Sequence, residues 1–398
     1  MLVPKLRFKR EDGTEFLEWE ELSMNEIFTE IIEKNRPDLP VLSILQGQGT
    51  VYRDSSDRNI LYDKKSTVNY KAMRKGDFII HLRTFEGGLE CATLDGISSP
   101  AYKILRTDKL IPEAYKAYFR SKQFIEGRLA IAVTGVRDGK NIEMSTFWQI
   151  LVPVACLEEQ QKIADFLSTV DEVITQSEAE VQNLAQQKKA AMQKIFSQEV
   201  RFKSEDGTDY PDLEEKNLSD ICESIVGGGT PTTENKEYWN GSIAWVSSSD
   251  LQNDNIHYLS ITRFITEDAI SHSATKLIPQ NSVLIVSRVG VGKVVIAPCQ
   301  LCTSQDFTNL VNPQCNSVFL AYLLSVIMQK KASGVQGTSI KGITAKEIKM
   351  YDVSIPCLEE QQKIANFLSA YDEAITCAKQ ELEHWKQLKK GLLQQMFV

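Results

Sequence analysis

The sequence predicts an α/β protein in which two mixed α/β domains are separated by two long antiparallel coiled-coil helices, in a circular arrangement with pseudo-two-fold symmetry. Three observations predict this fold class. Residues 151–175 and 352–376 are identical at 17 of 25 aligned positions, at an offset of 201. A long stretch with helical apolar periodicity begins inside each copy. A mixed α/β pattern precedes each copy, which indicates that a whole module is duplicated.

Two further repeats support duplication of the entire module. Residues 7–14 (RFKREDGT) recur as residues 201–208 (RFKSEDGT) at an offset of 194. Residues 76–102 align without gaps on residues 281–307 at an offset of 205. Both of these segments have the pattern of a strand, an arginine, a glycine-rich turn and a second strand. The domains between the repeated helices are therefore expected to be diverged copies of one another.

Each interval between the repeated segments has room for one domain. Short β-rich runs alternate there with helical stretches, among them residues 112–128 and 317–331, which is typical of mixed α/β structure. The predicted regions are residues 1–14 as the N-terminal part of a repeated region, 15–156 as the first domain, 157–208 as the central repeated region with its long helix, 209–357 as the second domain, and 358–398 as the C-terminal long helix.

The segments after each LEEQQKIA motif are predicted to be long helices. Pro153 and Pro356 stop the preceding strands, and paired glutamates follow in the first helical turn, where the helix dipole favours anions. No glycine or proline interrupts residues 157–200. A helix of about 40 residues would be about 60 Å long.

Apolar residues along both helices recur at alternating four- and three-residue steps, which is typical of a coiled-coil seam. Pairing of the two helices with each other, antiparallel, would close the duplicated module on itself. Lys188 and Lys389 interrupt the seam at equivalent places and either fix its register or extend to solvent. The expected seam and partner positions are Leu167, Val170, Ile174, Leu184, Lys188, Leu368, Tyr371, Ile375, Leu382, Trp385 and Lys389.

The chain is expected to be circular in its pattern of segments. The C-terminal helix ends at Met396 and Phe397, where the first helix ends at Ile195 and Phe196. The motif that follows Phe196 in the first copy is RFK…EDGT, and its other copy stands at the N-terminus. The start of the chain therefore completes its end.

Charge is unevenly distributed along this acidic chain, whose net charge is −8. Residues 34–140 carry 19 basic and 12 acidic side chains, and residues 263–349 carry 9 basic and 4 acidic ones. Two basic islands on an acidic frame suit two surfaces that face phosphates.

Loops within these domains supply the candidate DNA-binding residues, because arginine, lysine, threonine, serine and asparagine donate to phosphates and base edges. Gly229 belongs to the segment GGGTP, where backbone could approach a ligand closely or simply connect two elements. Each candidate could equally be a solvated loop residue. The candidates are Arg83, Arg137, Lys140, Asn141, Gly229, Thr230, Arg288, Lys293, Thr338, Ser339 and Lys341.

Several classes of protein find little support in the sequence. Eight cysteines in 398 residues do not make a disulfide scaffold, and the single CxxC at Cys299 and Cys302 does not support a metal site. The glycine-rich segment at residues 288–294 lacks the residues of a phosphate-binding loop, and Glu347 with Lys349 only imitates a nuclease motif. No signal peptide or membrane span is evident, so we expect a cytoplasmic protein without membrane association.

In combination these features resemble the specificity (S) subunit of type I restriction-modification enzymes, over the full chain. The first domain lacks the GGTP opening of the second and resembles a different subtype of target-recognition domain. The residues that carry the resemblance are the two CLEEQQKIA motifs with the prolines before them, GGTP from Gly228, Tyr238-Trp239, Trp245 through Asp250-Leu251, and QGTSIKGIT at residues 336–344.

The resemblance implies a function in DNA recognition. Each target-recognition domain would read one half of a bipartite, asymmetric site in double-stranded DNA, and the helices would set the gap between the halves. The helices would also dock methyltransferase (M) subunits, likely two in number by the symmetry, which use S-adenosylmethionine to methylate adenine. Nuclease/translocase (R) subunits would use ATP and Mg for cutting. The resemblance assigns this chain no bound cofactor, no metal and no catalytic residue.

Two other classes of function predict different features. A self-contained nuclease or methyltransferase would carry a cofactor motif and clustered acidic ligands, and we find neither in the sequence. A purely structural coiled-coil scaffold would not need two basic, divergent α/β domains.

Overall fold

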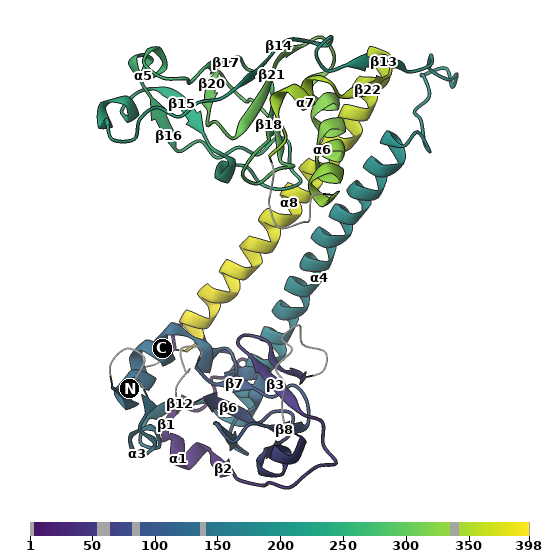
Figure 1. Ribbon diagram of the computed structural model, residues 1–398. Helices are drawn as coiled ribbons and strands as arrows, with labels where there is room; N and C mark the ends of the chain where they lie inside the picture. Colours follow the sequence, from purple (N-terminus) through teal and green to yellow (C-terminus); the bar gives the residue numbers. More distant parts are fainter. Residues whose placement is uncertain (1–3, 54–63, 82–87, 136–140, 335–341, 398) are drawn as a thin grey trace. The chain divides into compact units, whose positions relative to one another are not determined.

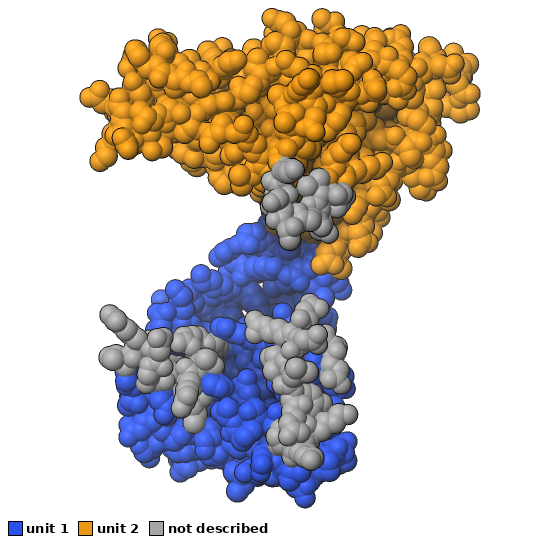
Figure 2. Space-filling model, in the orientation of Figure 1, with its two compact units in different colours: residues 1–178, 380–398 blue, residues 179–379 orange. Residues whose placement is uncertain are grey.

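The computed structural model describes residues 4–53, 64–81, 88–135, 141–334 and 342–397. The chain divides into two compact units, shown in different colours in Figure 2. The first unit consists of residues 1–178 and 380–398, and the second consists of residues 179–379. Each unit holds one β-rich domain and a part of each long helix.

The first unit is organised around an antiparallel sheet with strand order β2-β9-β6-β7 (Figure 1). Its strands are β1 (Glu20–Ser23), β2 (Thr29–Ile31), β3 (Leu42–Leu45), β4 (Gly49–Tyr52), β5 (Lys71–Met73), β6 (Phe78–His81), β7 (Glu90–Cys91), β8 (Gly96–Ser98), β9 (Tyr102–Arg106), β10 (Val133–Thr134), β11 (Asn141–Ile142) and β12 (Leu151–Val154). Its short helices are α1 (Met24–Ile27), η2 (Lys64–Asn69), α2 (Pro112–Tyr115), η3 (Tyr118–Arg120), η4 (Gln123–Arg128), η5 (Leu129–Ala132) and α3 (Met144–Phe147).

The second unit contains two four-stranded sheets, with strand orders β14-β21-β18-β19 and β16-β15-β20-β17. Its strands are β13 (Glu214–Asn217), β14 (Cys222–Gly227), β15 (Ile243–Val246), β16 (Arg263–Ile265), β17 (Leu277–Ile278), β18 (Val283–Val286), β19 (Val294–Ile296), β20 (Leu301–Thr303), β21 (Phe307–Pro313) and β22 (Asp352–Ile355). Its helices are η7 (Lys236–Trp239), η8 (Ser248–Asp250), α5 (Glu267–Ser271), α6 (Ser317–Gly334) and α7 (Ala345–Lys349).

The strands of the two units recur at the offsets found in the sequence. Strand β18 begins 205 residues after β6, and β20 and β21 begin 205 residues after β8 and β9. Glu20 of β1 lies opposite Val154 of β12, and Glu214 of β13 lies opposite Ile355 of β22. These positions are separated by the other two offsets, 194 and 201. The predicted duplication of an α/β module is therefore confirmed at the level of strand register.

The stretch predicted as helical over residues 112–128 is not one helix. Helix α2 ends at Tyr115, and Ser121 adopts extended backbone (φ −75°, ψ 151°) between the short turns η3 and η4. Its aromatic residues are buried on several sides, with Tyr118 and Phe119 inside the same core as Phe124. A straight helix presents one apolar stripe, so such all-round burial favours a broken path. The equivalent stretch in the second unit is the continuous helix α6.

Two long helices run through the units: α4 (Leu157–Phe196) and α8 (Leu358–Met396). Helix α4 stops four residues before the predicted end at Val200, and Gln198 takes a positive φ of 61°. In the first unit, Asp171 and Glu178 of α4 pair with Lys389 and Lys386 of α8. The order of these contacts makes the helices antiparallel there, as predicted. Within the described part of the chain, no helix combines the length and apolar character needed to cross a membrane.

Candidate nucleic-acid interface

Each long helix begins at a joint whose contacts are repeated in the two units. In the first unit, the Arg7 guanidinium donates to both carboxylate oxygens of Glu159, at 3.1 and 2.7 Å. In the second unit, Arg201 donates to both oxygens of Glu360, at 3.2 and 2.6 Å. Both glutamates are buried. The RFK and LEEQQ repeats therefore hold one another together by a bidentate ion pair.

A buried glutamine ties each β-rich domain to the first turn of its helix. The side-chain oxygen of Gln160 accepts a hydrogen bond of 2.8 Å from the backbone N–H of Ile111. That of Gln361 accepts a bond of 2.8 Å from the backbone N–H of Asn316. Ile111 and Asn316 are related by the domain offset of 205. The joint therefore fixes each domain to its helix in the same way.

The first unit joins the two ends of the chain as the second unit joins consecutive residues. The backbone N–H of Leu6 donates to the carbonyl of Gln395 at 3.0 Å. The equivalent bond in the second unit runs from Val200 to Lys194 at 3.2 Å. The rings of Trp19 and Phe397 also pack edge to face, 5.7 Å apart. The predicted circular order of segments is thus confirmed inside the first unit.

Of the residues predicted to contact DNA, six lie outside the described residues. These are Arg83, Arg137, Lys140, Thr338, Ser339 and Lys341. Asn141 is described and exposed, at the start of β11, where it pairs with Thr134 of β10. The Thr134 hydroxyl donates to the Asn141 carbonyl at 3.3 Å. This bond leaves the Asn141 amide side chain at the surface of the hairpin.

Gly229 packs closely against the protein itself. Its N–H donates to the Thr303 carbonyl at 2.8 Å, and its carbonyl accepts from the Trp245 indole at 3.0 Å. A Cβ at this position would lie 2.5 Å from the carbonyl carbon of Ala274. Thr230 is exposed beside it, and its hydroxyl contacts the side-chain oxygen of Gln305. The glycine therefore allows a tight internal contact that presents Thr230 at the surface.

Arg288 and Lys293 flank the turn between β18 and β19 but have different surroundings. Arg288 is exposed, and a Cβ on Gly342 would lie 3.2 Å from its Cγ. The backbone N–H of Ile343 donates to the Ser287 carbonyl at 2.7 Å. The structure therefore brings the end of the QGTSIKG segment to Arg288. Two candidate loops of the second domain meet at this point.

Lys293 is half-buried and bonded within the domain. Its ammonium donates to the carbonyls of Ser248 and Leu251, at 3.2 and 3.1 Å. These carbonyls belong to the turn that contains η8. The ammonium therefore holds this turn in place, which leaves Arg288 as the more accessible of the two cations.

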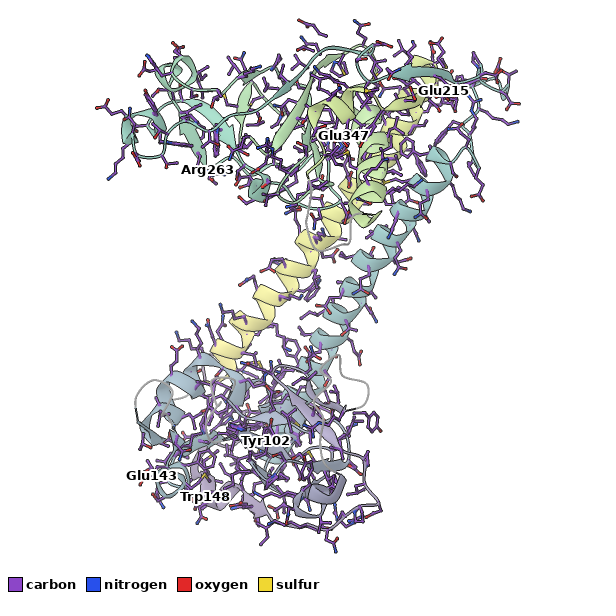
Figure 3. The ribbon with its side chains drawn as sticks, viewed as in Figure 1. Tyr102, Glu143, Trp148, Glu215, Arg263 and Glu347 are labelled. Atoms are coloured by element: carbon purple, nitrogen blue, oxygen red, sulfur yellow. The ribbon has the colours of Figure 1, made fainter. Side chains whose placement is uncertain are left out.

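Arg263 on β16 is a surface residue that the sequence reasoning missed (Figure 3). Its guanidinium carbon lies 4.7 Å from the centroid of the Trp245 ring, in cation–π geometry. It also donates to the Ser247 hydroxyl at 2.7 Å and to the Asp250 carboxylate. These partners come from a different strand and turn, so no local motif in the sequence marks them. Arg263 and Lys293 together hold the turn of η8 from two sides.

The predicted seam residues line both helices at different depths. Lys188 is 5% exposed and donates to Asp372 at 2.6 Å, so it does not extend to solvent. Lys389 is half-buried and contacts Asp171. Leu167, Val170, Leu368 and Ile375 are buried, whereas Ile174, Leu184, Tyr371, Leu382 and Trp385 are half-buried.

The described residues that suggested metal or nuclease chemistry have structural surroundings. Burial raises the pKa of the Cys302 thiol to about 12, which favours the protonated form. Glu347 accepts from the backbone N–H and the hydroxyl of Thr344, both at 2.7 Å, and so caps helix α7. These bonds lower the pKa of Glu347. Within the described ranges, no three histidine, cysteine or acidic side chains are grouped to hold a metal ion.

Comparisons with known proteins agree on one family. A family model described as "Type I restriction modification DNA specificity domain" matches residues 210–386. The chain is 35% identical over 211 residues to the type I restriction enzyme MjaIX specificity subunit of Methanocaldococcus jannaschii, an alignment that covers 51% of this chain and 48% of that protein. It is 28% identical over 250 residues to the EcoR124I/EcoR124II specificity subunit of Escherichia coli, which covers 59% of each. The chain thus spans about half the length of these curated relatives.

Solved structures show the same fold over nearly the whole chain. A structure from a study of complex assembly and conformational transition of the type I R-M system has a TM-score of 0.59 at 17% identity, covering 96% of this chain and 98% of that one. The type I S subunit of M. genitalium has a TM-score of 0.56 at 14% identity, covering 100% and 99%. Repeated joints, two β-rich domains and these relatives together show that the chain belongs to the family of type I restriction-modification specificity subunits.

Proposed function

We propose that this chain directs DNA methylation and restriction by reading a bipartite, asymmetric site in double-stranded DNA. Each β-rich domain reads one half of the site, and α4 and α8 set the number of unread base pairs between the halves. The helices also dock two methyltransferase subunits, and nuclease/translocase subunits join the complex. A rod of about 60 Å exceeds one turn of DNA, about 34–36 Å, so the two half-sites would lie in separate segments of major groove.

The repeated joint is the observation that carries this proposal. Arg7–Glu159 and Arg201–Glu360 repeat the same bidentate contact, and Gln160 repeats the role of Gln361. The domains mounted on these joints have diverged, because the first carries the broken stretch η3–η4 where the second carries α6. Identical mounts with different domains suit a protein that reads two different sequences with one framework.

Matching apolar residues near the joints support the docking of two like partners. Leu157 and Leu358, the first residues of α4 and α8, are 54% and 62% exposed. Leu6 and Val200, related by the offset of 194, are 37% and 48% exposed. Exposed apolar side chains at equivalent places favour two copies of the same partner surface. The methyltransferase subunits are the proposed partners.

We propose no catalytic residue and no bound cofactor for this chain. S-adenosylmethionine would be bound by the methyltransferase subunits, and ATP and Mg by the nuclease/translocase subunits. Extrusion of the target adenine from the helix would likewise be the task of the methyltransferase. Arg288, Thr230 and Asn141 are exposed polar residues on this chain and remain candidates for contact with DNA.

The test is methylation of a random-sequence DNA library by the chain co-expressed with its methyltransferase subunit. Sequencing of the modified adenines should give two half-sites at a fixed gap. Exchange of residues 15–156 for another domain of this type should change one half-site only. The matched exchange of residues 209–357 should change only the other half-site. Methylation by the partner alone with the same sequence preference would refute a role of this chain in recognition.

A further inference from the structure

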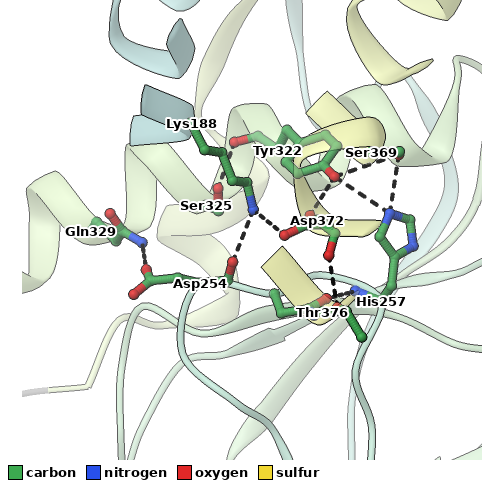
Figure 4. Close-up of polar contacts among 10 residues, drawn as sticks. Lys188, Asp254, His257, Tyr322, Ser325, Gln329, Ser369, Asp372 and Thr376 are labelled. Atoms are coloured by element: carbon green, nitrogen blue, oxygen red, sulfur yellow. Dashed lines mark hydrogen bonds and ion pairs between the residues drawn. The ribbon is translucent and has the colours of Figure 1, made fainter. Parts of the chain in front are cut away.

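A buried polar network in the second unit connects both long helices with the second β-rich domain (Figure 4). It includes Lys188 on α4, Asp372 on α8 and Tyr322 on α6. Lys188 and Asp372 are 5% and 4% exposed, and Tyr322 is completely buried. Charges at this depth are tolerated only when paired and well hydrogen-bonded. The contacts of each group therefore define what the network holds in place.

Lys188 contacts three different elements. Its ammonium donates to Oδ1 of Asp372 at 2.6 Å and to the backbone carbonyl of Asp254 at 2.9 Å. It also lies 5.1 Å from the centroid of the Tyr322 ring. One cation on α4 thus fixes a residue of α8, an aromatic ring on α6 and a loop of the domain.

Asp372 uses its two carboxylate oxygens for different partners. Oδ1 accepts from Lys188, and Oδ2 accepts from the Tyr322 hydroxyl at 2.5 Å. Burial raises the pKa of the Tyr322 hydroxyl, which therefore stays protonated as a donor. Because each oxygen is held by a different helix, the carboxylate fixes α4 and α6 relative to α8.

The loop at residues 254–257 is held from several directions. The Asp254 carboxylate accepts from the Gln329 side chain at 2.9 Å. A ring nitrogen of His257 lies 3.2 Å from the Ser369 hydroxyl on α8. Ile256, between them, is 2% exposed and belongs to the core of the unit. The loop is therefore clamped to α6 and α8 as well as to Lys188.

This loop leads directly into the turn that faces the candidate DNA-binding residues. A β-bridge between Leu251 and Leu259 closes its base. The Leu251 carbonyl accepts from Lys293, which follows Arg288 across the β18–β19 turn. The contacts therefore run without interruption from the helix pair to the loop of Arg288.

The equivalent pair in the first unit is much less enclosed. Lys389 and Asp171 stand 201 residues from Lys188 and Asp372, and their side chains are 23% and 32% exposed, against 7% and 5%. At the domain offset of 205, Ala117 takes the place of Tyr322, so no hydroxyl is available. Lys116 lies 3.8 Å from Asp171 instead. The buried clamp is therefore a feature of the second unit among the described residues.

We propose that Lys188, Asp372 and Tyr322 are positioning residues that fix the second reading domain on the helix pair and so set the gap at which its half-site is read. This inference rests on the proposed function in bipartite recognition. It goes beyond that function because it assigns the spacing to specific side chains rather than to helix length alone.

The physical basis is the directionality of the contacts. A buried ion pair is a weak source of stability compared with apolar residues of similar volume, but it can specify one register. An apolar replacement of both partners should preserve packing while removing the bonds to Asp254 and Tyr322. The double variant Lys188→Met with Asp372→Leu therefore separates positioning from folding.

The experiment compares methylation of DNA duplexes that contain the two half-sites at the natural gap and at gaps one base pair shorter and longer. The complex of the full chain with its methyltransferase subunits is used throughout. We expect the double variant to lose about tenfold in preference for the natural gap, while both half-sites stay the same. Tyr322→Phe, which removes one hydrogen bond, should give a smaller loss in the same direction.

The matched control is Lys389→Met with Asp171→Leu, the same exchange at the exposed pair of the first unit. Its preference for the natural gap should stay within about twofold of the unmodified complex. A folded Lys188–Asp372 variant with unchanged gap preference would overturn the positioning role, as would equal losses in both double variants. Failure of the unmodified complex to select any bipartite site would instead refute the proposed function.

Discussion

The indole N–H of Trp19 donates a 2.8 Å hydrogen bond to the carboxylate of Glu159, and both side chains are buried. The same carboxylate also accepts from Arg7. At the offset of 194, Leu213 takes the place of Trp19, so the equivalent Glu360 has no indole beside it. The two joints therefore share an ion pair and differ in one donor.

Trp19→Phe should lower the free energy of unfolding by about 1–3 kcal/mol, because a buried carboxylate loses a donor while the ring is largely kept. Urea unfolding followed by circular dichroism measures this loss. The control is Trp239→Phe, which removes an exposed indole bond of 3.2 Å to the Thr232 carbonyl. That change should stay within about 0.5 kcal/mol. Equal losses in the two variants would contradict a special role for the buried bond.

The duplication explains why much of the fold could be predicted from the sequence. Local hydrophobic patterns survive divergence, so the offset of 205 located β6 and β18 in advance. The pairing of β1 with β12 joins distant segments and could not be read from either one alone. The stacking of Arg263 on Trp245 has the same origin, since it depends on which strands become neighbours. The broken path near Ser121 followed from burial on several sides, which periodicity along the chain does not report.

Gly229→Ala should destabilise the second unit by about 1–3 kcal/mol, because the added methyl would lie 2.5 Å from backbone atoms of Ala274 and Thr275. The matched change is Gly391→Ala inside α8, where a Cβ would meet nothing within 4 Å. That substitution should stabilise the chain by about 0.5–1 kcal/mol through helix propensity. Thermal unfolding of both variants gives the two signs, and a stabilising Gly229→Ala would exclude the close approach described here.

Stability should depend on pH through His257. Burial lowers the pKa of this histidine below its ordinary value of 6.5, although the nearby charge of Asp372 opposes the shift and Lys188 adds to it. In the range below pH 6.5, the unfolded chain therefore binds the proton more readily than the folded chain does. Stability contributed by the neutral ring is present above pH 6.5 and is lost as the pH falls through the lowered pKa.

The variant His257→Gln should remove this part of the pH dependence. Urea unfolding of both proteins at pH 7.5 and 5.5 gives the comparison, with His272→Gln as the control at an exposed histidine. The unmodified protein and the control should lose more stability between the two pH values than His257→Gln does. Identical losses in all three proteins would exclude a contribution from His257.

Arg288 and Lys293 should separate DNA binding from stability, because one is exposed and the other is bonded within the domain. Arg288→Ala should weaken DNA binding by the assembled complex and reduce the slope of log K against log salt by about 1 if the side chain contacts a phosphate. Its free energy of unfolding should change by less than about 0.5 kcal/mol. Lys293→Met should instead cost about 1–3 kcal/mol, because the carbonyls of Ser248 and Leu251 lose their donor. Fluorescence anisotropy over a salt series and urea unfolding measure the two effects, and a reversed assignment would contradict the accessibility of Arg288.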